Sequence, residues 1–129
     1  GQFDEELFID SVDIDWCYRA MDCGFKCFGV FAANMSHQLG DEVVSFFNGH
    51  FIKYVHPPDR LYYIMRNRIY LYKRSYIPLS WKVQDFPRMV SKFAFFTLFV
   101  KPRLTNLQFM IKGLAEGIFS KKMERNAGF

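Results

Sequence analysis

Residues 59–75 read DRLYYIMRNRIYLYKRS, a stretch without glycine or proline between Pro57-Pro58 and Pro78. Proline suits the first position of a helix and cannot continue one, so both ends of the stretch are marked. We expect a helix of about four turns. Helical spacing gives it an apolar stripe and a polar-aromatic stripe: Leu61, Ile64, Met65 and Tyr72, then Tyr63, Arg66, Asn67, Tyr70 and Arg74. The side chains of the second stripe can form hydrogen bonds and stack on a ligand, or the stripe can simply be a solvated face.

Two further segments toward the C-terminus are strongly apolar. FAFFTLFV at 93–100 is too short to cross a bilayer, which needs about 20 apolar residues. LTNLQFMIKGLAEGIFSKK at 104–122 is amphipathic, with one apolar stripe made of Leu107, Met110, Ile111, Leu114 and Ile118. Both segments can lie in a membrane interface with bases on anionic lipid, or can pack against another part of the protein.

The chain before Pro57 is predicted to mix a helix with short strands. Residues 14–23 suit a helix that Asp13 or Asp15 caps and Gly24 ends. Residues 26–31 and 34–38 suggest short strands, and EVVSFFNGHFIKYV at 42–55 carries the hairpin signal Asn48-Gly49. We therefore predict an α/β chain, with short strands and a hairpin first and three helices after them.

Length and charge narrow the class of protein. With 129 residues, half of them hydrophobic, the chain has the size of one domain, and its start at Gly1 leads us to expect a piece of a longer protein. Residues 1–50 hold nine acids against two bases, whereas residues 51–129 hold four acids against fifteen bases. The basic half suits anionic lipid or a diphosphate. Nucleic acid is disfavoured because no recognition motif is present and the acidic half would repel phosphates.

Acidic residues gather in FDEELFIDSVDIDWCYRA at 3–20. Carboxylates in such a cluster can act as a general base or bind a metal ion. Asp13 and Asp15 are two residues apart at the predicted helix start, where the helix dipole favours anions, so either can also be an ordinary cap. Cys17, Cys23 and Cys27 lack paired CxxC spacing and are expected to be reduced thiols in the cytosol.

The first 26 residues, GQFDEELFIDSVDIDWCYRAMDCGFK, resemble a segment of family 2 glycosyltransferases. That segment reads approximately G-x-F-D-E-x-F-F, then E-D-x-D-hydrophobic-C-x-R-A and a Gly-aromatic pair. The matching residues here are Gly1, Phe3, Asp4, Glu5, Phe8, Asp13, Asp15, Trp16, Cys17, Arg19, Ala20, Gly24 and Phe25. The resemblance implies that Asp13 is the catalytic base and that substrate contacts come from Asp15, Trp16 and Arg19. Val12 stands where the family has glutamate.

Two later segments are also similar to this family. MSHQLGD at 35–41 resembles its H-x-x-G motif, which implies that His37 faces the diphosphate or its metal, although a lone histidine is more often structural. RLYYIMRNRIYLYKR at 60–74 resembles the R-x-x-Y-x-x-R-N helix of the rhamnosyltransferase branch. That match implies substrate-binding roles for Tyr63, Arg66 and Asn67, with Arg66 on a phosphate or a sugar carboxylate.

The resemblance implies the C-terminal, acceptor-side portion of an inverting glycosyltransferase with the GT-A fold. Residues 1–77 would belong to the catalytic domain, and residues 78–129 would form amphipathic, basic-aromatic helices. The donor would be a nucleotide sugar, with dTDP-rhamnose as the candidate, and the acceptor a glycan or lipid-linked glycan. Mg²⁺ or Mn²⁺ would be held mainly by the preceding part of the enzyme. The enzyme would lie in the cytoplasm or peripherally on the inner face of the cell membrane. The alternative is a non-catalytic membrane-surface or protein-interaction module.

Overall fold

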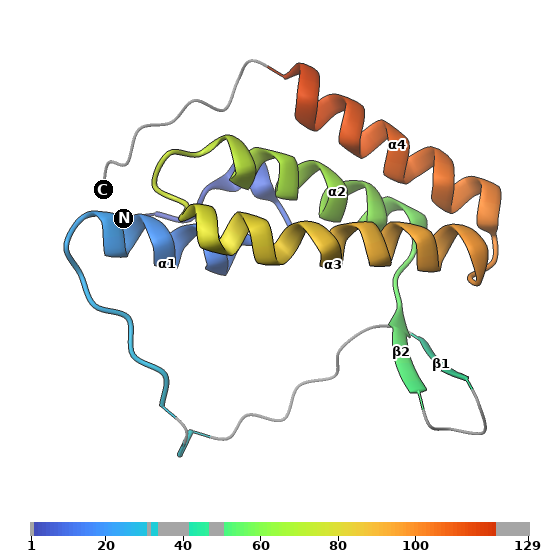
Figure 1. Ribbon diagram of the computed structural model, residues 1–129, viewed down its shortest axis with the longest axis horizontal. Helices are drawn as coiled ribbons and strands as arrows, with labels where there is room; N and C mark the ends of the chain where they lie inside the picture. Colours follow the sequence, from blue (N-terminus) through green and yellow to red (C-terminus); the bar gives the residue numbers. More distant parts are fainter. Residues whose placement is uncertain (1, 31, 34–41, 47–50, 121–129) are drawn as a thin grey trace.

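The computed structural model describes residues 2–30, 32–33, 42–46 and 51–120. Within these ranges, a short 3₁₀ helix, η1 (Glu5–Leu7), precedes the first of four α-helices. The longer elements are α1 (Val12–Asp22), β1 (Glu42–Phe46), β2 (Phe51–Val55), α2 (Pro58–Lys73), α3 (Leu79–Leu98) and α4 (Arg103–Phe119). α4 packs along α2 and also contacts α3, and Figure 1 shows the two strands projecting from the start of α2.

The predicted α/β class is wrong, because the described residues are organised around helices. Strands β1 and β2 pair only with each other, antiparallel, and form the one sheet among the described residues. This hairpin flanks the Asn48-Gly49 signal, although that turn lies outside the described residues. Residues 26–30, expected in a strand, are exposed and form no regular element, and 34–38 lie outside the described part of the chain. A short apolar run does not specify a strand by itself, and a strand without neighbours is not stable.

The helices begin and end close to their predicted positions. α2 starts at Pro58 and ends at Lys73, and α1 ends just before Gly24, whose φ of 88° suits only glycine well. The predicted cap of α1 is wrong. Ser11 occupies the cap position without a side-chain bond to the helix backbone, and Asp13 and Asp15 both lie inside the helix.

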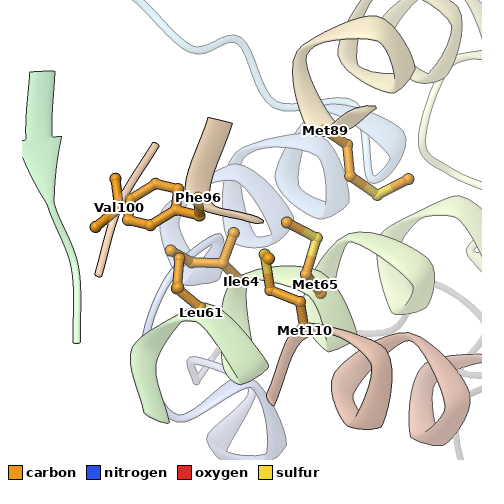
Figure 2. Packing of buried hydrophobic residues seen from close by; sticks show 7 residues of the cluster. All are labelled: Leu61, Ile64, Met65, Met89, Phe96, Val100 and Met110. Atoms are coloured by element: carbon orange, nitrogen blue, oxygen red, sulfur yellow. The ribbon is translucent and has the colours of Figure 1, made fainter. Parts of the chain in front are cut away.

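The main core lies between α2, α3 and α4 (Figure 2). Its members are Leu61, Ile64, Met65, Met89, Phe96, Val100 and Met110. The core therefore draws on residues from both sides of position 78. Because α2 contributes three of the seven side chains, the uninterrupted stretch at 59–75 is the element on which the other two helices pack.

Two glycines bring α4 close to α2. A Cβ atom on Gly113 would lie 3.1 Å from the carbonyl carbon of Tyr62, and one on Gly117 would lie 2.7 Å from Cβ of Ile69. Both distances are too short for a larger residue, so these positions need glycine for close helix packing. This contact leaves part of the apolar stripe of α4 outside: Ile111 and Ile118 are 51% and 55% exposed, whereas Met110 is buried in the core.

Candidate functional site

An unusual backbone leads into α1. In the segment from Asp4 to Ser11, which we term the acidic loop, three residues other than glycine have positive φ: Phe8 at 55°, Asp10 at 71° and Ser11 at 67°. Positive φ at a residue other than glycine costs roughly 1–3 kcal/mol. It persists only where surrounding contacts impose it. Other elements must therefore hold the acidic loop.

The polar stripe of α2 supplies that hold. Asn67 is fully buried, and its amide nitrogen lies 2.7, 2.8 and 3.0 Å from the backbone carbonyl oxygens of Leu7, Ile9 and Asp10. The nitrogen carries two hydrogens, so one of them is shared between two carbonyls. Arg66 adds a bond from Nη2 to the carbonyl of Glu6 at 2.6 Å, and its Nε donates to Oδ1 of Asn67 at 3.1 Å.

A buried ion network joins the acidic loop and α1 to the end of α2. Arg74, 1% exposed, donates to Asp4 at 2.6 Å and also to Asp15. The hydroxyl of Tyr76 donates to Oδ1 of Asp15 at 2.5 Å and accepts a bond from Arg74 at 3.0 Å. Removing the arginine would leave two buried carboxylates without their cation, a change that typically costs about 3–5 kcal/mol.

Asp13 differs from Asp15 in its surroundings, although both lie in the first turn of α1. Side chains two residues apart in an α-helix point in directions that differ by about 200°. With Asp15 turned inward to Arg74, Asp13 is turned outward and exposed. Within the described part of the chain, Asp13 makes no hydrogen bond or ion pair. Its carboxylate is therefore available to an external ligand, and that of Asp15 is already engaged.

Two further predicted site residues lie on α1 near Asp13. Trp16, three residues on and hence on the same side of the helix, is half-buried with its ring centroid 6.2 Å from that of the exposed Phe3. Arg19 donates from Nη2 to the carbonyl of Gln2 at 2.6 Å and lies 3.9 Å from Asp15. An exposed carboxylate and an aromatic pair thus share one surface.

The predicted binding residues of α2 are involved in holding the acidic loop. Arg66 is 9% exposed and lies 4.8 Å from the ring centroid of Tyr63, a ring that in turn lies 5.2 Å from that of Phe8. Glu116 of α4 approaches the same guanidinium at 3.7 Å. These contacts make Arg66 and Asn67 positioning residues. Their contact with substrate stays a prediction.

A second polar group connects α2 with α3. Asp85, buried in α3, accepts a hydrogen bond from Tyr72 at 2.8 Å and pairs with Arg68 at 3.2 Å. Burial, and next the bond to Asp85, raise the pKa of Tyr72. Lys92 lies on α3, as Asp85 does, and its pKa is lowered by burial and then by the nearby charge of Arg68.

Residues with metal-binding side chains do not converge in the described ranges. No three His, Cys, Asp or Glu side chains there are arranged to hold a metal ion. His37 lies outside the described residues, so its predicted role stays a prediction. The described residues therefore form no metal site of their own, and the expected Mg²⁺ or Mn²⁺ stays a prediction.

Within the described ranges, two surface cavities are lined by residues away from Asp13. One, of about 250 Å³, lies at the base of the hairpin and is lined by Val55, His56, Pro57, Pro58, Lys101, Pro102 and Asn106. The other, of about 240 Å³, is an apolar groove lined by Met65, Phe86, Met89, Val90, Phe93 and Leu114. Neither cavity includes a predicted site residue.

Sequence patterns did not reveal the ion network around Arg74. Arg74 and Asp4 are 70 positions apart, so no local spacing links them. The one available signal was the placement of Arg74 on the polar stripe of the central helix, which marks it as facing something other than the apolar core.

Comparison with known proteins gives one informative relative. The chain is 30% identical over 112 residues to the dTDP-rhamnosyl transferase RfbF of Shigella flexneri. The chain is similar to a glycosyltransferase. The match covers 87% of this chain and 36% of the relative, so the chain spans about a third of the relative's length. No protein-family model and no solved structure matches the chain.

Proposed function

We propose that this chain is the acceptor-side, C-terminal part of an inverting glycosyltransferase in which Asp13 is the general base. The observation that carries the proposal is the division between two aspartates of one helix turn. Asp15 is buried against Arg74, whereas Asp13 is exposed and without a partner among the described residues. A general base needs a carboxylate that can reach the proton of an incoming hydroxyl.

The proposed reaction is a single displacement at the anomeric carbon of the donor sugar. An acceptor hydroxyl forms the new bond to that carbon while the bond to the nucleoside diphosphate breaks on the opposite face. The hydroxyl proton passes to the carboxylate of Asp13, as water gives its proton to the base of an inverting glycosidase. Similarity to a dTDP-rhamnosyl transferase supports dTDP-rhamnose as donor. The acceptor that we propose is a glycan or lipid-linked glycan.

The surroundings of Asp13 support binding of a sugar. Trp16 and Phe3 together present aromatic surface, and sugars commonly lay their apolar face on such rings. The clamp formed by Arg66 and Asn67 fixes the acidic loop and with it the start of α1. A base held by a rigid second layer of contacts keeps its distance to the reacting hydroxyl.

The test is the substitution Asp13→Asn in the complete enzyme that carries this chain. Transfer should fall by about 10²- to 10⁴-fold, the usual effect of losing a general base. Donor affinity should change little, because the base contacts the acceptor side. Asp22→Asn is a matched control, since Asp22 is an exposed acid at the other end of the same helix. Turnover of the Asp13 variant above about 1% of wild type would exclude Asp13 as the base.

A further inference from the structure

The connection between α3 and α4 exposes apolar and cationic side chains together. Leu98, Phe99 and Leu104 are 58%, 60% and 75% exposed. Lys101 and Arg103, between them in the chain, are exposed as well. We call residues 98–104 the α3–α4 corner. Figure 1 shows it at the end of the helical layer opposite α1, so it is a surface separate from Asp13.

Exposed apolar residues continue from the α3–α4 corner along both helices. On α3 they follow one stripe at helical spacing, and the stripe contains Leu79, Val83, Phe86 and Val90. On α4 the stripe contains Leu104, Ile111 and Ile118. The apolar groove described above is lined by residues of both α3 and α4 and by Met65 of α2. This much exposed apolar surface usually marks a contact with a membrane or another protein.

Charge distinguishes between these two partners. The exposed cations of α3, α4 and their connection are Arg88, Lys101, Arg103 and Lys112. The acids of the same region are Asp85, buried against Arg68, and Glu116, which accepts a bond from Tyr62 and lies near Arg66. The surface therefore presents a net positive charge around exposed apolar side chains. That combination complements an anionic lipid surface.

We propose that the α3–α4 corner binds the surface of an anionic membrane. Leu98, Phe99 and Leu104 would enter the boundary between headgroups and acyl chains, and Lys101 and Arg103 would contact lipid phosphates. No helix in the described ranges is long and apolar enough to cross a membrane, and the contact proposed here is one at its surface. The inference stands on α3 and α4 alone and does not depend on the role of Asp13.

The test is flotation of the complete enzyme that carries this chain with phosphatidylcholine vesicles, prepared with and without phosphatidylglycerol. The wild-type enzyme should float with the anionic vesicles and lose affinity as salt is raised. The variant Leu98→Ser, Phe99→Ser, Leu104→Ser should lose at least about 10-fold in affinity. The matched control is Phe25→Ser, Phe28→Ser, which changes two residues that are equally exposed but distant in sequence from the corner, and should bind as wild type does.

A second variant keeps the test decisive if the serine variant does not fold. Lys101→Gln, Arg103→Gln alters only exposed side chains, and it should weaken binding on the order of 30-fold, from about 1 kcal/mol per cation at the surface. The proposal is overturned if wild type ignores both kinds of vesicle, or if it binds neutral and anionic vesicles equally. It is also overturned if the corner variants bind as well as wild type or the Phe25 and Phe28 control loses as much affinity as they do.

Discussion

The substitution Asn67→Ala tests whether α2 holds the acidic loop. Asn67 is fully buried, and its amide is within hydrogen-bond distance of three backbone carbonyls of the loop. Alanine keeps the helix and removes both N–H donors. No other described side chain donates to the carbonyl oxygens of Leu7 or Ile9, although the N–H of Ile9 reaches that of Leu7 at 2.6 Å.

The expected magnitude follows from these bonds. A buried acceptor left unsatisfied costs about 1–3 kcal/mol, and two donors are lost, so a native loop would be destabilised by about 2–6 kcal/mol. The loop also holds three residues at positive φ, whose strain favours release once the bonds are gone. We therefore expect the loop to open locally before the core of α2, α3 and α4 unfolds.

Hydrogen exchange followed by mass spectrometry measures this opening directly. A loss of 2 kcal/mol corresponds to exchange about 30-fold faster in residues 4–16, because about 1.4 kcal/mol equals one factor of ten. Peptides from α4 should change much less. Gln84→Ala is the control, since it removes an exposed amide from α3. If residues 4–16 exchange within about threefold of the wild-type rate, Asn67 does not hold the loop and the proposed clamp is refuted.

Two further predictions concern helix packing and charge. Gly113→Ala forces a Cβ atom against the backbone carbonyl of Tyr62 and should lower the free energy of unfolding by about 1–3 kcal/mol. A thermal melt measures this, with Gln108→Ala, at an exposed position of the same helix, as the control. An unchanged melting temperature of the Gly113 variant would contradict the close contact of α2 and α4. Lys92 has its pKa lowered from 10.5 by burial first and then by Arg68, with Arg60 lowering it further and Asp10 and Asp85 acting in the opposite direction. At pH values between the folded pKa and 10.5, the unfolded chain therefore binds more protons than the folded chain, so the free energy of unfolding rises with pH. Lys92→Met should be more stable than wild type at pH 7, by a margin that shrinks toward about pH 10. Urea unfolding at both pH values checks this, and a variant less stable at pH 7 would show that the carboxylates outweigh burial.

The helices could be predicted from the sequence because their signals are local. Proline at 57, 58 and 78 and the breaker-free stretch between them define α2, and Gly24 marks the end of α1. The α/β class failed because short apolar runs such as 26–31 have no period of their own. Whether such a run forms a strand depends on a neighbouring strand, and the described part of the chain places none beside residues 26–30.

The site was predictable only where its signals are local in the sequence. A resemblance selected Asp13 and the α2 residues, but spacing alone could not separate Asp13 from Asp15. That separation depends on Arg74 and Tyr76, which reach Asp15 from about 60 residues away, at separations of 59 and 61. Gly113 and Gly117, four residues apart, were a local signal of close helix packing that the apolar stripe of α4 concealed.

Kinetic coupling between Asn67 and Asp13 most directly tests whether α2 positions Asp13 as the proposed base. In the complete enzyme, Asn67→Ala should lower turnover by about 10-fold or more, because a base displaced by about 1 Å is far less effective. Joined to Asp13→Asn, it should add almost nothing, since the group that it positions is already absent. Losses that multiply in the double variant would show that Asn67 and Asp13 act separately, and the claim that α2 places the catalytic base would be wrong.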